Sequence, residues 1–348
     1  MHIVLLPLGW LFGAAMMVRN WLFDRHLLRA SAVPVPVISV GNMTAGGTGK
    51  TPLVEFCVRH LLDTKKRVGV VSRGYRRRSH GVVTVSDGEH VLEDSSRGGD
   101  EAVQIAQKFR SVPVVVGEWR VDAARTIVER YGVDVVVLDD GFQHRYLRRD
   151  LDIVVMDAQR RTAREWFLPA GLRREPMAEL RRAGLVAFSR ATAGSPREDL
   201  STWYNGPVVS YRYRTDGILT LTAAGLVWAG QLRNVQAYAF SGIGDHRSFV
   251  NGLRREGITV LGSHRFADHH PYSAGDCAGI AAEARTAGAD ACFTTEKDAV
   301  RLMAAREGLD ALLFQVPVFV LRIGVEFIEG EDLVRSMLDA CVGRRGRS

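Results

Sequence analysis

A glycine-rich segment between a predicted strand and a predicted helix constrains the fold of this chain more than any other feature. Residues 41–52 read Gly-Asn-Met-Thr-Ala-Gly-Gly-Thr-Gly-Lys-Thr-Pro, after the apolar run 35–40 and before the helix-like run 53–62. In a P-loop of this kind, backbone N–H groups close around phosphates, the lysine reaches the terminal phosphates and the next hydroxyl binds Mg²⁺. A glycine-rich connection without a ligand does not explain a Lys-Thr pair at the helix start. We therefore predict a nucleotide site, although Thr44 stands where the usual motif has its first glycine.

Two consecutive aspartates complete the predicted nucleotide site. Asp139 directly follows four apolar residues at the end of the predicted strand 133–138, as a Walker B aspartate does when it holds Mg²⁺. Asp140 doubles the negative charge. A helix cap or a loop turn is the alternative for such a pair, but the upstream P-loop favours the metal. We expect ATP and Mg²⁺ as cofactors, and the predicted nucleotide-binding residues are Thr44, Ala45, Gly46, Gly47, Thr48, Gly49, Lys50 and Thr51.

Continuous apolar runs alternate with helix-like segments over residues 31–200. Such runs predict the strands of a parallel sheet that helices cover on both faces. The predicted fold class is therefore α/β, with a P-loop NTPase-like doubly wound sheet. The predicted strands are 35–40, 67–72, 113–117, 133–138, 151–157 and 184–189.

At 348 residues the chain is long enough for a second, smaller unit. The runs 208–213 and 218–222 predict two antiparallel strands with a turn at 215–217. A second α/β pattern follows, with predicted strands at 235–240, 259–261, 291–294 and 318–321 and a helix at 331–341. The predicted division is an N-terminal apolar helix at 1–30, a P-loop domain at 31–200, a two-stranded connector at 201–233 and a smaller α/β domain that closes over the cleft at 234–348.

The net charge of +7 implies an anionic partner. Nucleic acid and anionic lipid both fit, but the chain shows no helix-turn-helix, zinc finger or RNP-like aromatic pattern to read bases. The N-terminus favours lipid, because residues 3–18 are uncharged and are followed by Arg19, Arg25 and Arg29. Spanning a bilayer takes ~20 apolar residues, and proline and glycine interrupt this shorter run. We expect a monotopic anchor; a helix docked on the protein's own core is the alternative.

Three further stretches have structural alternatives. Asp100 begins a helix-like segment and, taken alone, is best explained as an N-cap. His269 and His270 are adjacent in a loop, where a metal site would need a third ligand. Residues 295–298, Thr-Glu-Lys-Asp, superficially resemble a guanine-reading loop, but their order does not support guanine specificity. The four cysteines form no C-x-x-C pair, which is typical of reduced thiols, and no metal cluster is indicated.

Taken together, these motifs resemble those of the tetraacyldisaccharide 4′-kinase family of lipid A biosynthesis. The resemblance covers nearly the whole chain in order, and its motifs are specific jointly rather than singly. Threonine at position 44 agrees with it, because the P-loop of this family is itself atypical. The stretches that carry the resemblance are 41–52, 72–75, 99–101, 138–144, 168–171, 174–176, 240–244, 266–269 and 295–298.

The resemblance implies an activity and a location. The activity is ATP-dependent phosphorylation of the 4′-hydroxyl of an acylated glucosamine disaccharide 1-phosphate, giving lipid IVA. The location is the cytoplasmic face of a Gram-negative inner membrane, with this glycolipid and the anionic membrane surface as partners and no nucleic acid. The rival hypotheses are a P-loop ATPase or switch protein without a small-molecule acceptor, and a kinase that acts on nucleic acid ends.

The resemblance also implies roles for individual residues. Asp100 paired with His269 activates the acceptor hydroxyl, while Lys50 and Thr51 serve ATP and Mg²⁺. The implied catalytic residues are Asp100, His269, Lys50 and Asp139; the implied metal ligands are Thr51, Asp139, Asp140 and Glu175; and the implied neighbours of substrate or nucleotide are Tyr75, Arg120, Gln143 and His144.

Overall fold

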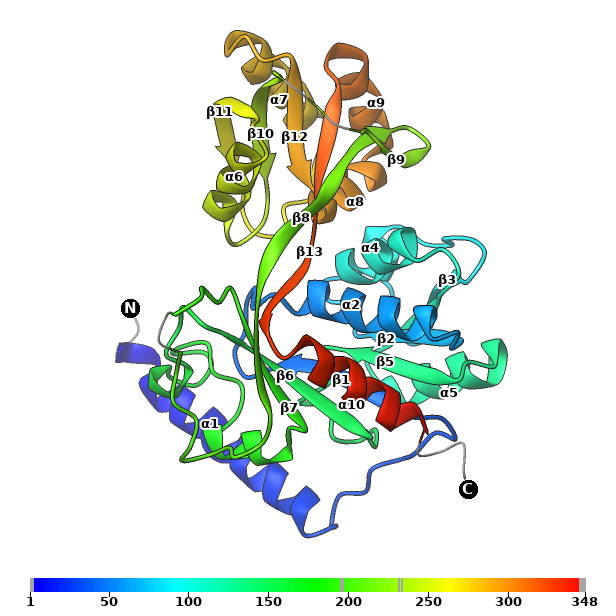
Figure 1. The fold of residues 1–348 in the computed structure, drawn as a ribbon, viewed down its shortest axis with the longest axis vertical. Helices are drawn as coiled ribbons and strands as arrows, with labels where there is room; N and C mark the ends of the chain where they lie inside the picture. The colour runs from blue at the N-terminus through cyan, green and yellow to red at the C-terminus, as the bar shows by residue number, and fades with distance from the viewer. Residues whose placement is uncertain (1–2, 195–196, 231, 233, 344–348) are drawn as a thin grey trace.

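Six parallel strands form the sheet around the P-loop, as predicted. The structure is a computed structural model that describes residues 3–194, 197–230, 232 and 234–343. In this part of the chain the strand order is β7-β6-β1-β5-β2-β4, and the first residues of β8 (Val208–Thr222) extend the sheet by pairing in parallel with β7. Strand β3, which was not predicted, pairs antiparallel with β4 at the other edge (Figure 1). The strands are β1 Val37–Asn42, β2 Val68–Ser72, β3 Val83–Asp87, β4 Pro113–Val116, β5 Val135–Asp139, β6 Leu151–Asp157 and β7 Leu185–Ser189.

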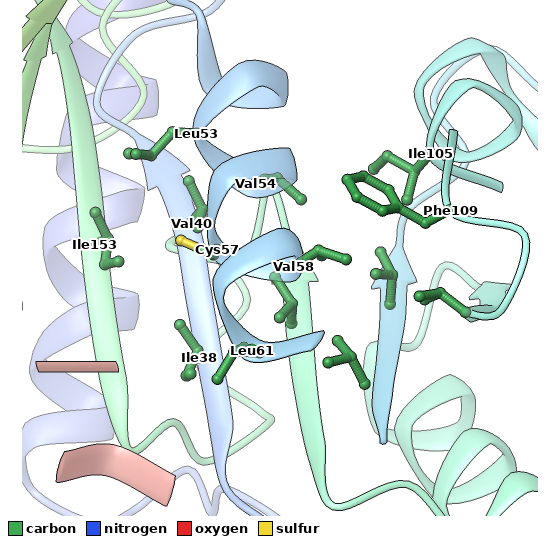
Figure 2. Close-up of a cluster of buried hydrophobic side chains, with 14 of the residues drawn as sticks. Ile38, Val40, Leu53, Val54, Cys57, Val58, Leu61, Ile105, Phe109 and Ile153 are labelled. Carbon is green, nitrogen blue, oxygen red and sulfur yellow. The ribbon is translucent and has the colours of Figure 1, made fainter. Parts of the chain in front are cut away.

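Helices cover both faces of this sheet, which confirms the doubly wound arrangement. Successive side chains of β1 point to opposite faces, so Ile38 packs with α2 (Lys50–Asp63) and α4 (Asp100–Lys108), whereas Val37 packs with α5 (Arg120–Tyr131). Figure 2 shows the apolar side of α2 lying over β1, and the helix also packs against β5. Each fully buried aliphatic side chain there stabilises the fold by ~1.5–3 kcal/mol. The glycine-rich loop therefore connects a fully buried strand, β1, to a largely buried helix, α2.

A long two-stranded ribbon, β8 (Val208–Thr222) with β13 (Val318–Glu329), runs between the two units (Figure 1). The predicted hairpin turn at 215–217 is wrong, because β8 continues through these residues and pairs antiparallel with β13. A bulge in this ladder absorbs the Asp-Gly turn signal. Gly217 has φ +138° and lies against Trp228, whose ring would be 2.1 Å from an added Cβ. The glycine therefore serves close packing rather than a turn.

The second unit is a smaller α/β layer in which strands β11, β10, β12 and β13 pair in parallel. Two apolar clusters cover its two faces. This unit confirms the second α/β pattern, with every predicted strand present. Its elements are β10 Gln236–Ser241, α6 His246–Arg255, β11 Thr259–Arg265, α7 Ala274–Thr286, β12 Ala291–Thr295, α8 Glu296–Ala304 and α9 Arg306–Gln315.

The C-terminal helix α10 (Glu331–Gly343) packs on the first unit, although it falls within the stretch 234–348 predicted as the smaller domain. Val334, Leu338 and Cys341 are buried in the same apolar cluster as α2 and β1. Strand β13 carries the chain back from the second unit. The chain therefore crosses between the units twice, once along β8 and once along β13.

The N-terminal helix α1 (Leu6–Asp24) lies on the outside of the first unit (Figure 1). Its glycine side touches the protein closely, since a Cβ added at Gly13 would lie 2.6 Å from the Phe167 ring. On its other side Trp10 and Leu11 are 64% and 67% exposed. None of the helices in the described ranges is long and apolar enough to cross a membrane. The remaining short elements are η1 Ile3–Leu5, α3 Ser95–Gly98, η2 Thr162–Arg164, η3 Met177–Arg182 and β9 Gly225–Trp228.

A buried ion cluster connects the P-loop helix with the second unit. Glu55 of α2 accepts hydrogen bonds from Lys108 Nζ at 2.6 Å and from Gln104 Nε2 at 2.8 Å, both on α4. Lys108 Nζ also lies 3.6 Å from a carboxylate oxygen of Glu296 on α8. Burial raises the pKa of Glu55 to about 7, against the attraction of Lys108.

We expect this raised pKa to make stability depend on pH. The folded protein binds a proton at Glu55 more tightly than the unfolded chain, so the contribution of Glu55 is complete below its ordinary pKa of 4.5 and is lost as pH rises through about 7. Between about pH 5 and about pH 8, Glu55→Gln should therefore lose less unfolding free energy than the wild type, by roughly 1–3 kcal/mol. Urea unfolding followed by circular dichroism measures this, with Glu129→Gln at an exposed position of α5 as control. Parallel pH curves for Glu55→Gln and wild type would contradict the raised pKa.

Candidate active site

Strand β8 holds one side of the P-loop. Gly49 precedes the first residue of α2 and adopts φ +83°, a conformation that other residues seldom take. A Cβ at Gly49 would collide with the hydroxyl of Tyr213, and the hydroxyl of Tyr211 donates to the Gly49 carbonyl at 3.0 Å. On the other side, Gly46 and Gly47 have no atom within 4 Å of an added Cβ. The loop backbone is therefore fixed from β8 and open where a phosphate would lie.

Thr44 fits the loop because its backbone does not adopt a positive φ. It is buried and forms an antiparallel bridge with Arg173. Thr48 is held from two sides, since its Oγ1 accepts from Asn42 Nδ2 at 2.8 Å and its carbonyl accepts from Ser189 Oγ at 2.6 Å. The departure from the usual motif at position 44 therefore does not disturb the shape of the loop.

Lys50 begins α2 and faces Asp140, which directly follows β5. Lys50 Nζ lies 3.3 Å from Asp140 Oδ1, and Arg174 Nη1 donates to the two oxygens of Asp140 at 2.8 Å and 3.0 Å. Burial would raise the pKa of Asp140, but Lys50 and Arg174 hold it well below its usual range. Asp140 is therefore ionised and orients Lys50.

Asp139, the last residue of β5, is the better placed of the two aspartates to hold a metal. Its Oδ2 accepts from Ser72 Oγ at 3.2 Å. Burial, with the negative charges of Glu101 and Asp140, raises the pKa of Asp139 to about 6, and a divalent cation would relieve that repulsion. Among the residues described, no group of three or more His, Cys, Asp or Glu could hold a metal alone. The residues present fit Mg²⁺, which takes one or two protein ligands and fills its shell with phosphate oxygens and waters. Asp139 and Thr51 would supply those protein ligands.

Glu175 belongs to a different network, and this geometry does not support the metal role expected for it. Its Oε1 accepts from Arg19 Nη2 at 2.7 Å and from Asn20 Nδ2 at 3.3 Å, both on α1. Its Oε2 accepts from Arg182 Nη2 at 2.6 Å. Burial raises the pKa of Glu175, against the attraction of Arg182 and Arg19. Both oxygens are engaged, and Glu175 fastens α1 to the first unit.

Asp100, the first residue of α4, contacts two side chains of the second unit. The N-cap explanation of Asp100 is wrong, because Gly99 occupies the cap position and no side chain caps the helix. His269 Nδ1 lies 2.8 Å from Asp100 Oδ2, and Arg301 Nε donates to the same oxygen at 2.6 Å. The two residues that the resemblance pairs, Asp100 and His269, are thus in direct contact across the two units.

The stretch 295–298 also contacts the first unit. Thr295 caps α8 by accepting from the backbone N–H of Asp298. Lys297 Nζ lies 2.8 Å from Glu101 Oε1. Burial would raise the pKa of Glu101, but the charge of Lys297 lowers it to about 2. The motif therefore starts a helix and joins the two units by an ion pair.

Tyr75 and Gln143 lie beside residues already placed in the site. The Tyr75 ring meets the His269 ring edge to face, with centroids 5.5 Å apart. Gln143 Nε2 donates to the Asn42 carbonyl at 2.8 Å, and its Oε1 accepts from Arg174 at 3.3 Å. Tyr75 therefore borders the Asp100–His269 pair, whereas Gln143 borders the P-loop.

Arg120 places a positive charge next to the aspartates, and His144 lies close enough for this charge to act on it. Burial lowers the pKa of Arg120 to about 10, against the attraction of Asp140. Burial and the charge of Arg120 lower the pKa of His144 to about 3, so its imidazole is neutral. The Nε of Arg120 and the Nε2 of His144 are buried and have no hydrogen-bond partner among the described residues. Both groups are therefore available to a polar group that enters the site.

Comparison with known proteins decides the family. A family model described as tetraacyldisaccharide-1-P 4′-kinase matches residues 1–342. The chain belongs to the tetraacyldisaccharide-1-P 4′-kinase family. Tetraacyldisaccharide 4′-kinases of Chlorobium limicola and Chlorobium luteolum are 36% and 39% identical to it, and the matches cover 97% and 98% of each pair of chains.

A solved structure shows that the similarity includes the fold. The crystal structure of LpxK from Aquifex aeolicus in complex with ATP is 30% identical, with a TM-score of 0.79 over 98% of this chain and 99% of that one. Membership of the tetraacyldisaccharide-1-P 4′-kinase family confirms the resemblance that the motifs 41–52 and 138–144 carry. It also confirms the predicted α/β fold class.

Two parts of the site are not apparent from the motifs of this kinase family. Arg301 lies four residues after Lys297, so helical spacing within α8 places both on one face. That spacing is a signal that could have identified Arg301. Tyr211 and Tyr213 lie in a strand predicted only as a connector, and their contacts with Gly49 join residues more than 160 positions apart. No local sequence pattern predicts such long-range contacts.

Proposed function

We propose that this chain transfers the γ-phosphoryl group of ATP to the 4′-hydroxyl of tetraacyldisaccharide 1-phosphate, giving lipid IVA. Family membership supports this reaction. The observation that carries the site assignment is the contact of Asp100 Oδ2 with His269 Nδ1. This pair adjoins the nucleotide site. Glu101, the residue after Asp100, is close enough to Asp139 for its negative charge to raise the pKa of Asp139. A protein that only hydrolyses ATP has no need of such a pair between two units.

Each group has one task in the proposed reaction. Lys50 contacts the terminal phosphates and stabilises the charge that develops during transfer. The Asp100–His269 pair receives the proton of the attacking hydroxyl. Because the carboxylate accepts from Nδ1–H, the Nε2 of His269 is left as an additional proton acceptor. Mg²⁺, when bound through Asp139 and Thr51, supplies positive charge beside the phosphates.

We place the glycolipid headgroup against Tyr75, Arg120, Gln143 and His144. The unpaired Nε–H of Arg120 and the neutral imidazole of His144 suit phosphate and sugar oxygens. Tyr75 is 51% exposed beside His269, where it would border the acceptor sugar. This arrangement puts the acceptor between the proton-accepting pair and the P-loop.

We propose that α1 attaches the enzyme to the cytoplasmic face of the inner membrane. Trp10 and Trp21 expose 64% and 51% of their surface, and such side chains are stable at the membrane interface. The opposite side of α1 is held by the Glu175 contacts with Arg19 and Asn20. The helix would therefore lie on the bilayer without leaving the protein, and it would bring the site to a lipid acceptor.

Replacing Trp10 and Trp21 by serine and Leu11 by glutamine is expected to weaken binding to anionic vesicles by at least ~10-fold, because the apolar area entering the interface is lost. Vesicle sedimentation measures this loss. Phe314→Ser, which removes an apolar side chain that is 92% exposed on α9, should leave binding unchanged. Raised salt should weaken binding of the wild type, since exposed arginine contacts are screened within ~10 Å at 0.1 M. Unchanged sedimentation of the triple variant would contradict the anchor.

The proposed function is tested by the dependence of ATP turnover on the acceptor. Purified protein with Mg·ATP should turn over rapidly with the acylated disaccharide 1-phosphate and slowly without it. An oligonucleotide with a free 5′ end should not stimulate turnover. Stimulation by the oligonucleotide, or full turnover without any acceptor, would favour the nucleic-acid-end kinase or the switch ATPase instead.

A further inference from the structure

Arg301 of α8 lies at the centre of the contact between the two units. It is 4% exposed, and its guanidinium makes three kinds of contact. Nε donates to Asp100 Oδ2 at 2.6 Å, and Nη1 donates to the Gly242 carbonyl and to Asp298 Oδ1, each at 2.9 Å. One side of the guanidinium therefore holds the first unit and the other side holds the second.

The partners of Arg301 in the second unit are themselves fixed. Asp298 is fully buried, and its Oδ1 also accepts from the Gly242 backbone N–H at 2.9 Å and from the Tyr272 hydroxyl at 3.0 Å. Its Oδ2 accepts from Thr295 Oγ1 at 2.6 Å. Because these bonds leave little freedom to Asp298, the guanidinium of Arg301 has a defined position.

The contacts with Asp100 are asymmetric. Arg301 Nε and His269 Nδ1 both donate to Oδ2, whereas no donor to Oδ1 occurs within the described ranges. A guanidinium can hold both oxygens of a carboxylate through two N–H groups. Here Arg301 Nη2 is buried and has no partner in the part of the chain that the structure describes. The carboxylate is thus held by one oxygen and presents the other.

We propose that Arg301 is a positioning residue for phosphoryl transfer: by holding Oδ2 of Asp100, it directs Oδ1 toward the acceptor hydroxyl. This inference rests on the proposed function, in which the Asp100–His269 pair receives the hydroxyl proton. Burial would lower the pKa of Arg301, but the charges of Asp298 and Asp100 raise it, so the guanidinium is a cation held against this carboxylate. Among the described residues, the charged and titratable groups that face Asp100 are His269 and Arg301 from the second unit. Lys297 lies close enough for the charge of Asp100 to act on it.

The alternative is that Arg301 only joins the two units as a buried ion pair. A matched control exists in Arg322 of β13, whose Nε donates to Glu296 Oε1 of α8 at 2.8 Å. That contact also ties α8 in place, but it does not involve Asp100. A merely structural Arg301 should therefore behave like Arg322, with an effect on melting and none on the pH dependence of the reaction.

The test compares Arg301→Met, Arg301→Lys and Arg322→Met by steady-state kinetics with the disaccharide 1-phosphate, pH profiles and thermal melting. Arg301→Met should lower kcat by about 10²-fold, because a misdirected catalytic group loses its near-attack geometry. Its KM for ATP should stay near that of the wild type. The acidic limb of its kcat/KM profile should move to higher pH, since the positive charge that faces the proton-accepting pair is gone.

The other two variants separate charge from geometry. Arg301→Lys keeps the charge, so its acidic limb should stay near that of the wild type, while kcat falls by about 10-fold because one ammonium cannot make all three contacts. Where Arg301→Met does not fold, Arg301→Lys still gives the comparison. Arg322→Met should keep the wild-type pH profile whatever its melting temperature.

Two results would overturn the inference. The first is a normal kcat and a normal pH profile in both Arg301 variants, and the second is the same profile shift in Arg322→Met. Asp100→Asn belongs in the same experiment, because it distinguishes this failure from failure of the proposed function. Loss of turnover in Asp100→Asn with normal Arg301 variants removes only the positioning role. Normal turnover in Asp100→Asn removes the proton-accepting pair and the positioning role with it.

Discussion

Lys50→Ala is expected to lower kcat by about 10³-fold, because the ammonium that stabilises charge on the transferring phosphoryl group is lost from a preorganised site. The fold should stay intact, since Lys50 lies at the open start of α2 and its partner Asp140 keeps the contact with Arg174. Single-turnover transfer at saturating Mg·ATP measures the chemical step. Lys66→Ala, just beyond the end of the same helix, is the control.

Thr51→Ala should reduce activity through the metal. Raising the Mg²⁺ concentration should recover part of its turnover but none of the turnover of Lys50→Ala, because Thr51 is assigned to the cation and Lys50 is not. Near wild-type turnover of Lys50→Ala with saturating nucleotide would require another position for the phosphates.

Asp100→Asn is expected to lower kcat by about 10²–10⁴-fold with little change in ATP affinity, because asparagine is isosteric but does not take up the proton. Asparagine also keeps an oxygen that can accept from Arg301, so melting should change less than in Asp100→Ala, which removes one partner of a buried guanidinium. Steady-state kinetics and thermal melting on the same preparations separate the two effects. Near-normal turnover of Asp100→Asn would remove the proton-accepting role.

His269→Ala should resemble Asp100→Asn, since the two side chains share one hydrogen bond. The double variant is expected to be little worse than the poorer single variant, as for residues that act as a unit. Multiplicative losses in the double variant would mean that the two residues act independently.

The parallel strands could be predicted because buried strands are continuous apolar runs. Val135 to Leu138 is such a run, and it ends at Asp139, where the ligand-binding edge of an α/β sheet lies. The hairpin turn predicted at 215–217 was wrong because of long-range strand pairing. A local Asp-Gly signal favours a hairpin, but β13 offers a longer antiparallel partner and the ladder absorbs the signal as a bulge.

Single side chains of the site were harder to predict than its loops. Taken alone in the sequence, Asp100 is best explained as a cap, but Gly99 occupies the cap position and the partners of Asp100 come from the second unit. The family resemblance implies a metal role for Glu175, yet two arginines and Asn20 donate hydrogen bonds to its oxygens. Such choices depend on contacts between distant segments, and no local spacing encodes them.

The most direct test of the proposed reaction is single-turnover transfer from γ-labelled ATP to the disaccharide 1-phosphate, run beside an analogue that lacks only the 4′-hydroxyl. We predict that the label appears in the natural glycolipid and that the 4′-deoxy analogue stays unlabelled, although it should compete for the same site. Label in the 4′-deoxy analogue, or the same rate of phosphate release with either compound, would contradict phosphoryl transfer to the 4′-hydroxyl.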